Sequence, residues 1–173
     1  MVMAPRLRKL MLCAHVTSTV GWLGAVAVFL GLAAIGLTSD DPQTVRAAYL
    51  VMEPAAWLVL IPLSLASLVT GLVQSFGTIW GLFRHYWVLF KLLITVAATI
   101  VLLTYMETFS VISGVAADPN ADPAVIRNPS PLLHASLALL ALLVATVLAV
   151  YKPRGMTRYG WRKQHEQRTL SQP

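Results

Sequence analysis

Charged residues are scarce in this chain, and they are missing from four long stretches. Only 12% of the 173 residues are Asp, Glu, Lys or Arg, 57% are hydrophobic, and the mean hydropathy is +0.71. No charged side chain occurs at positions 10–39, 54–83, 92–106 or 128–151. Soluble domains contain about 25% charged residues. The composition therefore excludes an ordinary soluble domain and indicates an integral membrane protein.

Cysteine is nearly absent as well. The single residue, Cys13, excludes an intramolecular disulfide and any Cys-x-x-Cys zinc or redox motif. The sequence also shows no Ser-His-Asp set, no Walker loop and no paired carboxylates within the apolar stretches. Nucleophilic, phosphoryl-transfer and general-acid chemistry thus have no visible centre, and an enzyme is the least favoured class.

The apolar stretches predict transmembrane helices, because roughly 20 apolar residues cross a hydrocarbon core of ~30 Å. We expect an all-α integral membrane protein, a four-helix transmembrane bundle at residues 10–151 with helices at about 10–38, 47–78, 86–114 and 131–151. The third apolar stretch is short, and it becomes long enough if Trp87 to Lys91 enters the membrane while the Lys91 ammonium snorkels back to the interface. Thr44 is expected to cap the second helix, and Pro62 to kink it.

The basic residues predict the orientation of this bundle. With the N-terminus inside, eleven of the thirteen Lys and Arg fall on the cytoplasmic side, and only Arg46 and Arg127 fall outside. Both termini are then cytoplasmic: a basic N-terminus at 1–9 and a basic tail at 152–173. We expect a multi-pass protein of the plasma (inner) membrane whose tail lies along anionic headgroups, with Tyr159 and Trp161 at the interface. A tail this short is no nucleic-acid-binding face.

Two helices carry polar faces at helical spacing. In the first helix the residues that share a face are His15, Ser18, Trp22, Ala25 and Phe29. In the second, small and polar residues follow each other at intervals of three and four: Ser64, Ser67, Gly71, Gln74 and Thr78. Such a seam should face protein, since lipid offers no hydrogen-bonding partner. It favours either helix packing or the lining of a ligand or ion path.

Three histidines are the candidate metal ligands. His15 lies ~7 Å inside the cytoplasmic interface, His85 begins the third helix on the same side, and His134 lies ~20 Å from His15, at the outer end of the fourth helix. Two imidazoles from facing helices suit a b-type haem, and imidazole with sulfur suits copper(I). Alternatively, His85 and His134 are solvated at the interfaces, and His15 is a neutral imidazole hydrogen-bonded to a neighbouring helix.

Further sequence features resemble a known family. The segments HVTSTVGWLGA, Pro62 with Thr70 and Gly71, and WGLFRHYWVLFKLL resemble small bacterial membrane proteins of the copper-resistance D type and their domain-of-unknown-function relatives. The resemblance covers about residues 10–106, and the positions that match are His15, Trp22, Gly24, Gly71, Trp87 and Lys91. It implies a helical bundle in the plasma membrane and, for the copper-resistance members, copper uptake.

Two functions are therefore expected. One is the handling of copper or haem through His15, with His85 as a possible partner. The other is a non-catalytic structural or regulatory subunit that contacts lipid, another membrane protein or a second copy of this chain.

Overall fold

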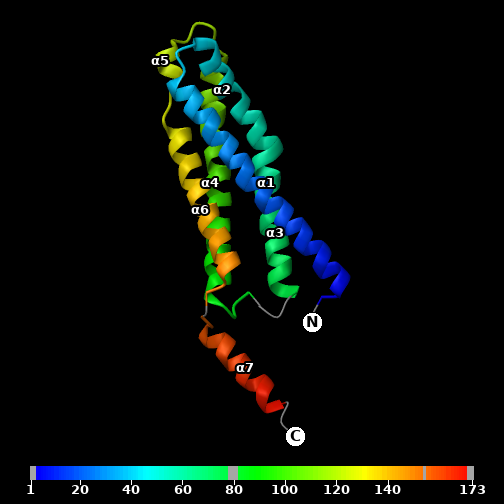
Figure 1. Cartoon of the computed structure of the whole chain (residues 1–173). Helices are drawn as coiled ribbons and strands as arrows, with labels where there is room; N and C mark the ends of the chain where they lie inside the picture. Colours follow the sequence, from blue (N-terminus) through cyan, green and yellow to red (C-terminus); the bar gives the residue numbers. More distant parts are fainter. Residues whose placement is uncertain (1–2, 78–81, 154, 171–173) are drawn as a thin grey trace.

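Long helices running side by side form most of the described chain in this computed structural model (Figure 1), which describes residues 3–77, 82–153 and 155–170. The elements, in chain order, are α1 (Pro5–Thr38), α2 (Pro42–Ala55), the π-helical turn η1 (Ala56–Leu60), α3 (Ile61–Gly77), α4 (Tyr86–Ala117), α5 (Pro123–Ile126), α6 (Ser130–Tyr151) and α7 (Arg158–Leu170).

Four helical segments are long and apolar enough to cross a membrane: Pro5–Thr38, Pro42–Gly77, Tyr86–Ala117 and Ser130–Tyr151. They confirm the all-α, four-helix membrane architecture. Two segments begin earlier than predicted, at Pro5 and Pro42, because a proline fits the first turn of a helix, where its missing N–H leaves no bond unmade. The predicted end of the second helix at Thr78 lies outside the described residues.

Asp41, rather than the predicted Thr44, caps α2. Its carboxylate accepts hydrogen bonds from the backbone N–H of Gln43 (3.2 Å) and of Thr44 (3.1 Å), and from the Thr44 hydroxyl (2.6 Å). The Thr44 hydroxyl, followed by the two backbone N–H groups, lowers the pKa of Asp41 below its ordinary value, because these bonds stabilise the charged form. Thr44 thus contributes to the cap as a donor.

The π-helical turn η1 lies between the two prolines of the second crossing. Pro54 precedes it inside α2 and Pro62 follows it in α3. A proline offers no backbone N–H and its ring crowds the carbonyl four residues earlier, which disturbs regular α-helical bonding. The Ile61 N–H donates instead to the carbonyl of Ala56, five residues back. The irregularity expected near Pro62 is therefore a turn of wider helix just before that residue.

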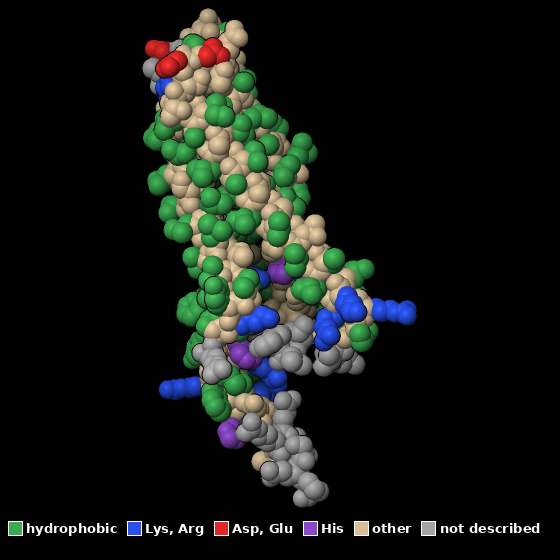
Figure 2. Space-filling model, in the orientation of Figure 1, with side chains coloured by type: hydrophobic (Ala, Val, Ile, Leu, Met, Phe, Trp, Pro, Cys, Tyr) green, Lys and Arg blue, Asp and Glu red, His purple; other side chains and the backbone are tan. Residues whose placement is uncertain are grey.

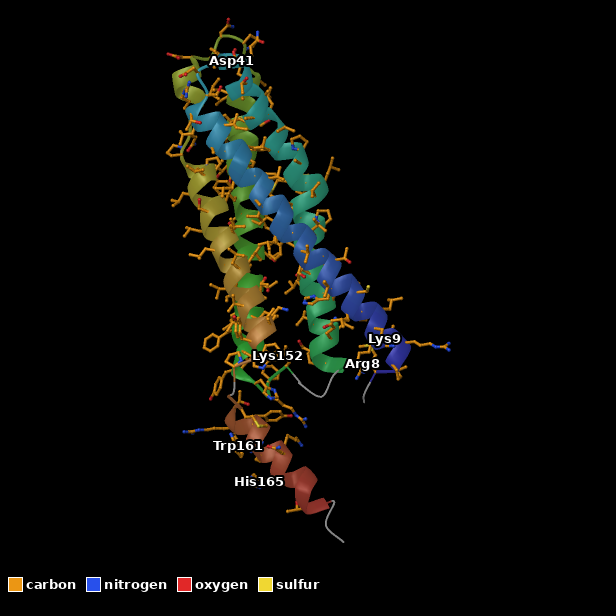
Figure 3. The ribbon with its side chains drawn as sticks, in the orientation of Figure 1. Arg8, Lys9, Asp41, Lys152, Trp161 and His165 are labelled. Carbon is orange, nitrogen blue, oxygen red and sulfur yellow. The ribbon has the colours of Figure 1, made fainter. Side chains whose placement is uncertain are left out.

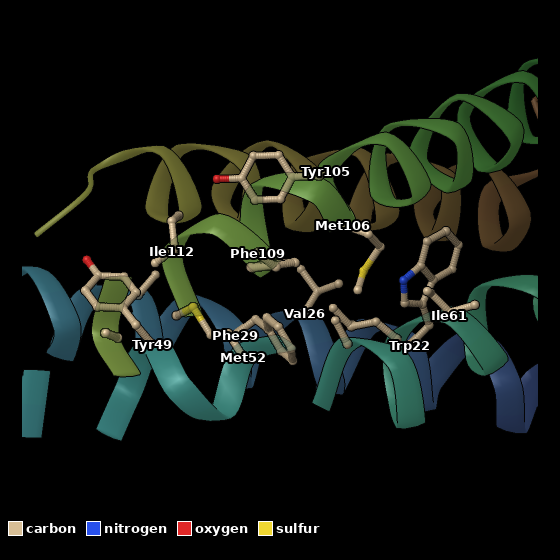
Figure 4. Packing of buried hydrophobic residues seen from close by; sticks show 14 of the residues in the cluster. Trp22, Val26, Phe29, Tyr49, Met52, Ile61, Tyr105, Met106, Phe109 and Ile112 are labelled. Atoms are coloured by element: carbon tan, nitrogen blue, oxygen red, sulfur yellow. The ribbon is translucent and has the colours of Figure 1, made fainter. Parts of the chain in front are cut away.

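Buried aromatic and sulfur-containing side chains fill the half of the bundle farther from the chain ends (Figure 4). The ring of Phe109 on α4 contacts Phe29 on α1 edge to face (5.7 Å between centroids) and Tyr105 likewise (4.9 Å). Tyr49 and Met52 of α2 are almost fully buried beside them. Edge-to-face packing is favourable for aromatic quadrupoles. This packed half holds α1, α2 and α4 together and leaves the other half more open.

Arg46 and Arg127, the two basic residues that were predicted to fall outside, stabilise the C-termini of helices. Arg46 donates hydrogen bonds to the carbonyls of Ala116 (3.2 Å) and Asp118, at the end of α4. Arg127 donates to the carbonyl of Leu37 (2.8 Å), at the end of α1. The last carbonyls of a helix lack partners within it and carry partial negative charge. Arg46 and Arg127, the two basic residues outside the predicted cytoplasmic cluster, therefore have structural roles. The other described Lys and Arg side chains in view gather toward the end of the bundle where the chain begins and ends (Figure 2).

The basic tail forms a helix attached to the connection between α3 and α4. Met156 pairs with His85 in an isolated antiparallel bridge, and the Thr157 N–H donates to the Arg84 carbonyl (3.0 Å). The Thr157 hydroxyl accepts a bond from the Gly160 N–H (3.0 Å), which caps α7. Trp161 is 54% exposed on α7, which projects from the basic end of the bundle (Figure 3).

Gly36 should be essential for the close packing of α1 on α2. A methyl group there would lie 2.9 Å from Cζ of the fully buried Tyr49, whose hydroxyl is fixed by two 3.1 Å bonds to the backbone of Asn128. We expect Gly36→Ala to lower the free energy of unfolding by about 1–3 kcal/mol, the usual cost of overpacking. Gly31→Ala, on the same helix with no atom within 4 Å, should be neutral or slightly stabilising. Unfolding in detergent, followed by circular dichroism, measures both, and equal effects would contradict this packing.

Candidate functional site

His15 is buried on the face of α1 that the spacing predicted. Its imidazole is 8% exposed, and Ser18, Trp22 and Phe29 of the same face are buried with it. The Nδ1 atom lies 3.0 Å from the hydroxyl oxygen of Thr70 on α3. That hydroxyl is itself within donating distance of the Ala66 carbonyl, one turn earlier. The Thr70 hydroxyl therefore donates its proton to the Ala66 carbonyl and accepts a hydrogen bond from the Nδ1–H group of His15. This assigns the neutral imidazole to the Nδ1–H tautomer.

Lys91 on α4 completes the environment of the imidazole. Its Nζ atom lies 3.0 Å from the other ring nitrogen, Nε2 of His15. Because Nδ1 carries the proton, Nε2 presents a lone pair to the Lys91 ammonium, and the pair holds one positive charge. The side chain of Lys91, which was predicted to snorkel to the interface, is half-buried and turns to α1. The reason is that a hydrogen-bond acceptor lies within reach inside the bundle.

Gly71 gives the imidazole its place between α1 and α3. A methyl group at this position would lie 3.1 Å from Cε1 of His15, tighter than ordinary van der Waals contact. The adjacent Thr70 supplies the hydrogen bond, so consecutive residues of α3 provide the space and the partner for one ring. Gly71 of the polar seam therefore packs against α1, while Ser67, Gly71 and Gln74 also line a cavity, so the arrangement fits both interpretations of the seam.

His15, Gly71 and Lys91 line a cavity of about 730 Å³ among α1, α3, α4 and α6, near the basic end of the bundle. Figure 2 shows a hollow on this side, with a histidine and a basic side chain at its wall. The polar and charged side chains of the lining are Arg8, His15, Thr19, Ser67, Gln74, Ser75, Lys91, Thr95, Thr146 and Lys152. Among the described residues the lining contains no Asp or Glu, so the cavity is positively charged.

Four of the five Ser and Thr hydroxyl groups that line this cavity have already used their protons. Those of Thr19, Ser75, Thr95 and Thr146 each donate to a carbonyl of their own helix, at 2.8 or 2.9 Å. The Nε2 atom of Gln74 is different: within the described part of the chain it is the one buried side-chain nitrogen or oxygen that lacks a hydrogen-bond partner. Free N–H groups are therefore offered by Gln74 and by the remaining protons of the Lys91 ammonium.

The other two predicted metal ligands, His85 and His134, contact residues other than His15. His134 stacks on Tyr105 (4.1 Å between centroids), and its Nδ1 atom lies 2.9 Å from the Ser130 carbonyl at the start of α6. His85 precedes α4, and its ring is 6.4 Å from that of Trp87. Cys13 is exposed. Across the described residues, no three His, Cys, Asp or Glu side chains are close enough together to hold a metal ion.

A second cavity, of about 480 Å³, was not predicted from the sequence. It lies between α4 and α6, and its lining is almost entirely apolar. Five of the lining residues are alanines: Ala97, Ala98, Ala135, Ala138 and Ala141. The spacing of three along α6 places small side chains on one face, which is a signal visible in the sequence. The same pattern also occurs where helices pack tightly, so it does not indicate a cavity by itself.

Comparison of the chain with protein-family models, curated proteins and solved structures gives no match in any of the three. The resemblance to copper-resistance D proteins stays a prediction based on the segments quoted above.

Thr70 should stabilise the bundle through the imidazole of His15. Thr70→Val keeps the shape of the side chain but leaves the buried Nδ1–H without its acceptor (3.0 Å). We expect a loss of about 1–3 kcal/mol in the free energy of unfolding, the cost of an unsatisfied buried donor. Thr104→Val, which removes an exposed hydroxyl bonded within α4, is the matched control. If the two variants unfold alike in detergent, Thr70 is not the partner of His15.

Proposed function

We propose that this multi-pass membrane protein binds an anionic group, a phosphate or a carboxylate, in the positively charged cavity around Lys91. The observation that carries the proposal is the ammonium of Lys91 inside a membrane-spanning helix, hydrogen-bonded to a neutral imidazole and facing a cavity whose described lining includes no carboxylate. The binding of an anion would neutralise this charge.

The energetic argument rests on the cost of a charge within lipid. Placing a lysine at the centre of a transmembrane helix costs about 2.5–3.5 kcal/mol, and Lys91, the sixth residue of α4, carries a smaller part of this cost. Such residues normally pair or face a water-filled path. The lone pair of His15 compensates part of this cost without supplying negative charge. An anion in contact with Lys91 and with the unpartnered amide of Gln74 would satisfy both groups.

Arg8 and Lys152 extend the positive field to the entrance. Both line the cavity near the chain ends, where the described basic residues gather (Figure 3). Clefts lined by one sign of charge raise the local concentration of the opposite ion. The anionic group has two possible sources, a free anion from the aqueous side and the headgroup of an acidic lipid.

We propose in addition that the basic end faces the cytoplasm of a cell with a plasma (inner) membrane. The sequence asymmetry of Lys and Arg supports this orientation, and both termini lie at that end of the bundle (Figure 1).

Replacing Lys91 by Met should weaken anion binding while leaving the fold intact, because it removes a costly charge. With protein in zwitterionic phosphatidylcholine nanodiscs, we expect affinity for the bound anion to fall by about 10- to 100-fold, as for the loss of one charged hydrogen bond. The probes are inorganic phosphate, measured by calorimetry, and phosphatidylglycerol, counted by native mass spectrometry. Binding of the first identifies a free anion, and binding of the second alone identifies a headgroup.

Lys9→Met is the matched control for this experiment. Lys9 lies near the start of α1, at the basic end of the bundle, and its side chain extends away from the bundle (Figure 3). It is not part of the cavity lining. It should keep the affinity of the parent protein, and Lys91→Arg should retain part of it. Equal losses in Lys9→Met and Lys91→Met would mean that the binding is surface electrostatics, and no binding of either probe would refute the proposal.

Copper or b-type haem bound through His15 is the second candidate function. The position of the imidazole on the cavity wall, with its basic nitrogen Nε2 turned to α4, favours it. The metal would need that lone pair, which now accepts the hydrogen bond of Lys91, and a further ligand beside His15. The described arrangement therefore fits an anion better than a metal.

The two candidates predict opposite effects of Lys91→Met. If His15 binds metal, removal of Lys91 frees Nε2, and copper content or a haem Soret band should rise. His15→Ala should abolish either signal, and His165→Ala, an exposed histidine of α7, should not. Absorbance and metal analysis of protein from cells supplied with copper and a haem precursor provide the measurement. A signal unchanged in His15→Ala would exclude His15 as the ligand.

A further inference from the structure

The positively charged cavity and the apolar cavity are neighbours along the same helices. Trp22 on α1 lines both of them. On α4 the lining passes from Leu92 and Thr95 in the first cavity to Ile94 and Ala97 in the second. On α6 it passes in the same way, from Leu142 in the first to Ala141 in the second. The two spaces therefore follow one another between α4 and α6, with Trp22 at their junction.

The apolar cavity exists because small residues face each other across α4 and α6. Ala98 of α4 and Ala138 and Ala141 of α6 leave room that longer side chains would fill. The cavity continues along α4 from Ile94 to Phe109, a distance of about 23 Å at 1.5 Å per residue. This length is most of the ~30 Å hydrocarbon core. A space so long, narrow and apolar matches a hydrocarbon chain.

Aromatic side chains close the far end of this space. Tyr105 and Phe109 line it there, together with His134, whose ring stacks on Tyr105. The Tyr105 hydroxyl donates to Ser130 (2.8 Å) and the His134 Nδ1 atom is bonded to the Ser130 carbonyl, so these polar groups are partnered within the protein. At this end the apolar cavity is therefore lined by aromatic rings. The polar groups lie beyond its other end, in the positively charged cavity around Lys91.

We propose that the ligand is an acidic amphiphile, which places its phosphate or carboxylate head against Lys91 and Gln74 and its hydrocarbon chain in the apolar cavity beyond Trp22. This inference rests on the proposed anion site and names the class of its ligand. The polarity of the two neighbouring cavities matches such a molecule at both ends. The apolar lining would hold the chain by van der Waals packing in place of bilayer lipid, so a chain that fits the cavity should add to the affinity of the head.

The test compares inorganic phosphate and two alkyl phosphates with one alcohol. Inorganic phosphate, hexyl phosphate and hexadecyl phosphate carry the same head with no chain, a short chain and a long chain, and hexadecanol carries the chain without the charge. Affinities of the full-length protein in phosphatidylcholine nanodiscs, corrected for partition into empty nanodiscs, should rise at least 10-fold from inorganic to hexadecyl phosphate. Lys91→Met should weaken all three phosphates and leave hexadecanol unchanged.

Ala138→Phe fills the apolar cavity without touching Lys91. It should lower the affinity for hexadecyl phosphate about 10-fold and leave inorganic phosphate unchanged. Ala27→Phe, the same substitution at an exposed position of α1, is the matched control and should change neither. Ala141→Leu fills less space and serves if Ala138→Phe does not fold, with a smaller loss expected in the same direction.

The outcomes separate this inference from the proposed function. If inorganic phosphate binds through Lys91 but the chain adds no affinity, or if Ala138→Phe has no effect on hexadecyl phosphate, the amphiphile is refuted and the anion site stands. If none of the phosphates binds, both are refuted.

Discussion

The hydrogen bond between His15 and Lys91 is the interaction on which the proposed function depends. A charge in a medium of low dielectric constant is costly unless groups within the protein compensate it. Here the imidazole supplies a lone pair, and its tautomer is set by Thr70 on a third helix. One ring thereby joins α1, α3 and α4 at the more open end of the bundle. The net positive charge that is left gives the adjoining cavity its preference for anions.

The two ends of the bundle are built differently. Around Phe29, Tyr49 and Phe109 the helices are held by interlocking aromatic rings, and Arg46 and Arg127 bind the ends of α4 and α1. Around His15 the contacts are polar and the side chains leave a cavity. The aromatic contacts fix α1, α2 and α4 relative to each other, although Phe29 and Phe109 also line the apolar cavity beside α6. Because these helices are already fixed, the end around His15 can remain open. A binding site at the open end therefore requires no further scaffold.

The fold was predictable from the sequence, because an uncharged apolar stretch that is long enough to cross the bilayer is stable there as an α-helix. The buried face of α1 was predictable too, because three- and four-residue spacing fixes which side chains share a side. The hydrogen-bond partners of His15 could not be predicted from the sequence. Periodicity within one helix gives no register between helices, so Lys91 was expected at the interface, and a second histidine beside His15. The start of α2 was missed because Asp41 caps the backbone N–H groups of Gln43 and Thr44, about one turn before the groups that Thr44 itself would have capped.

The arrangement also explains why a histidine suits position 15 better than a carboxylate. An Asp or Glu facing Lys91 would neutralise it within the bundle, and the cavity would lose its attraction for an anion. An imidazole accepts the hydrogen bond of Lys91 without cancelling its charge, and its second nitrogen anchors the ring to Thr70. The lysine is thus held in place while its field is left for a ligand. A bound phosphate or carboxylate would then complete the charge balance that the described lining leaves open, which links the unusual pair to the cavity beside it.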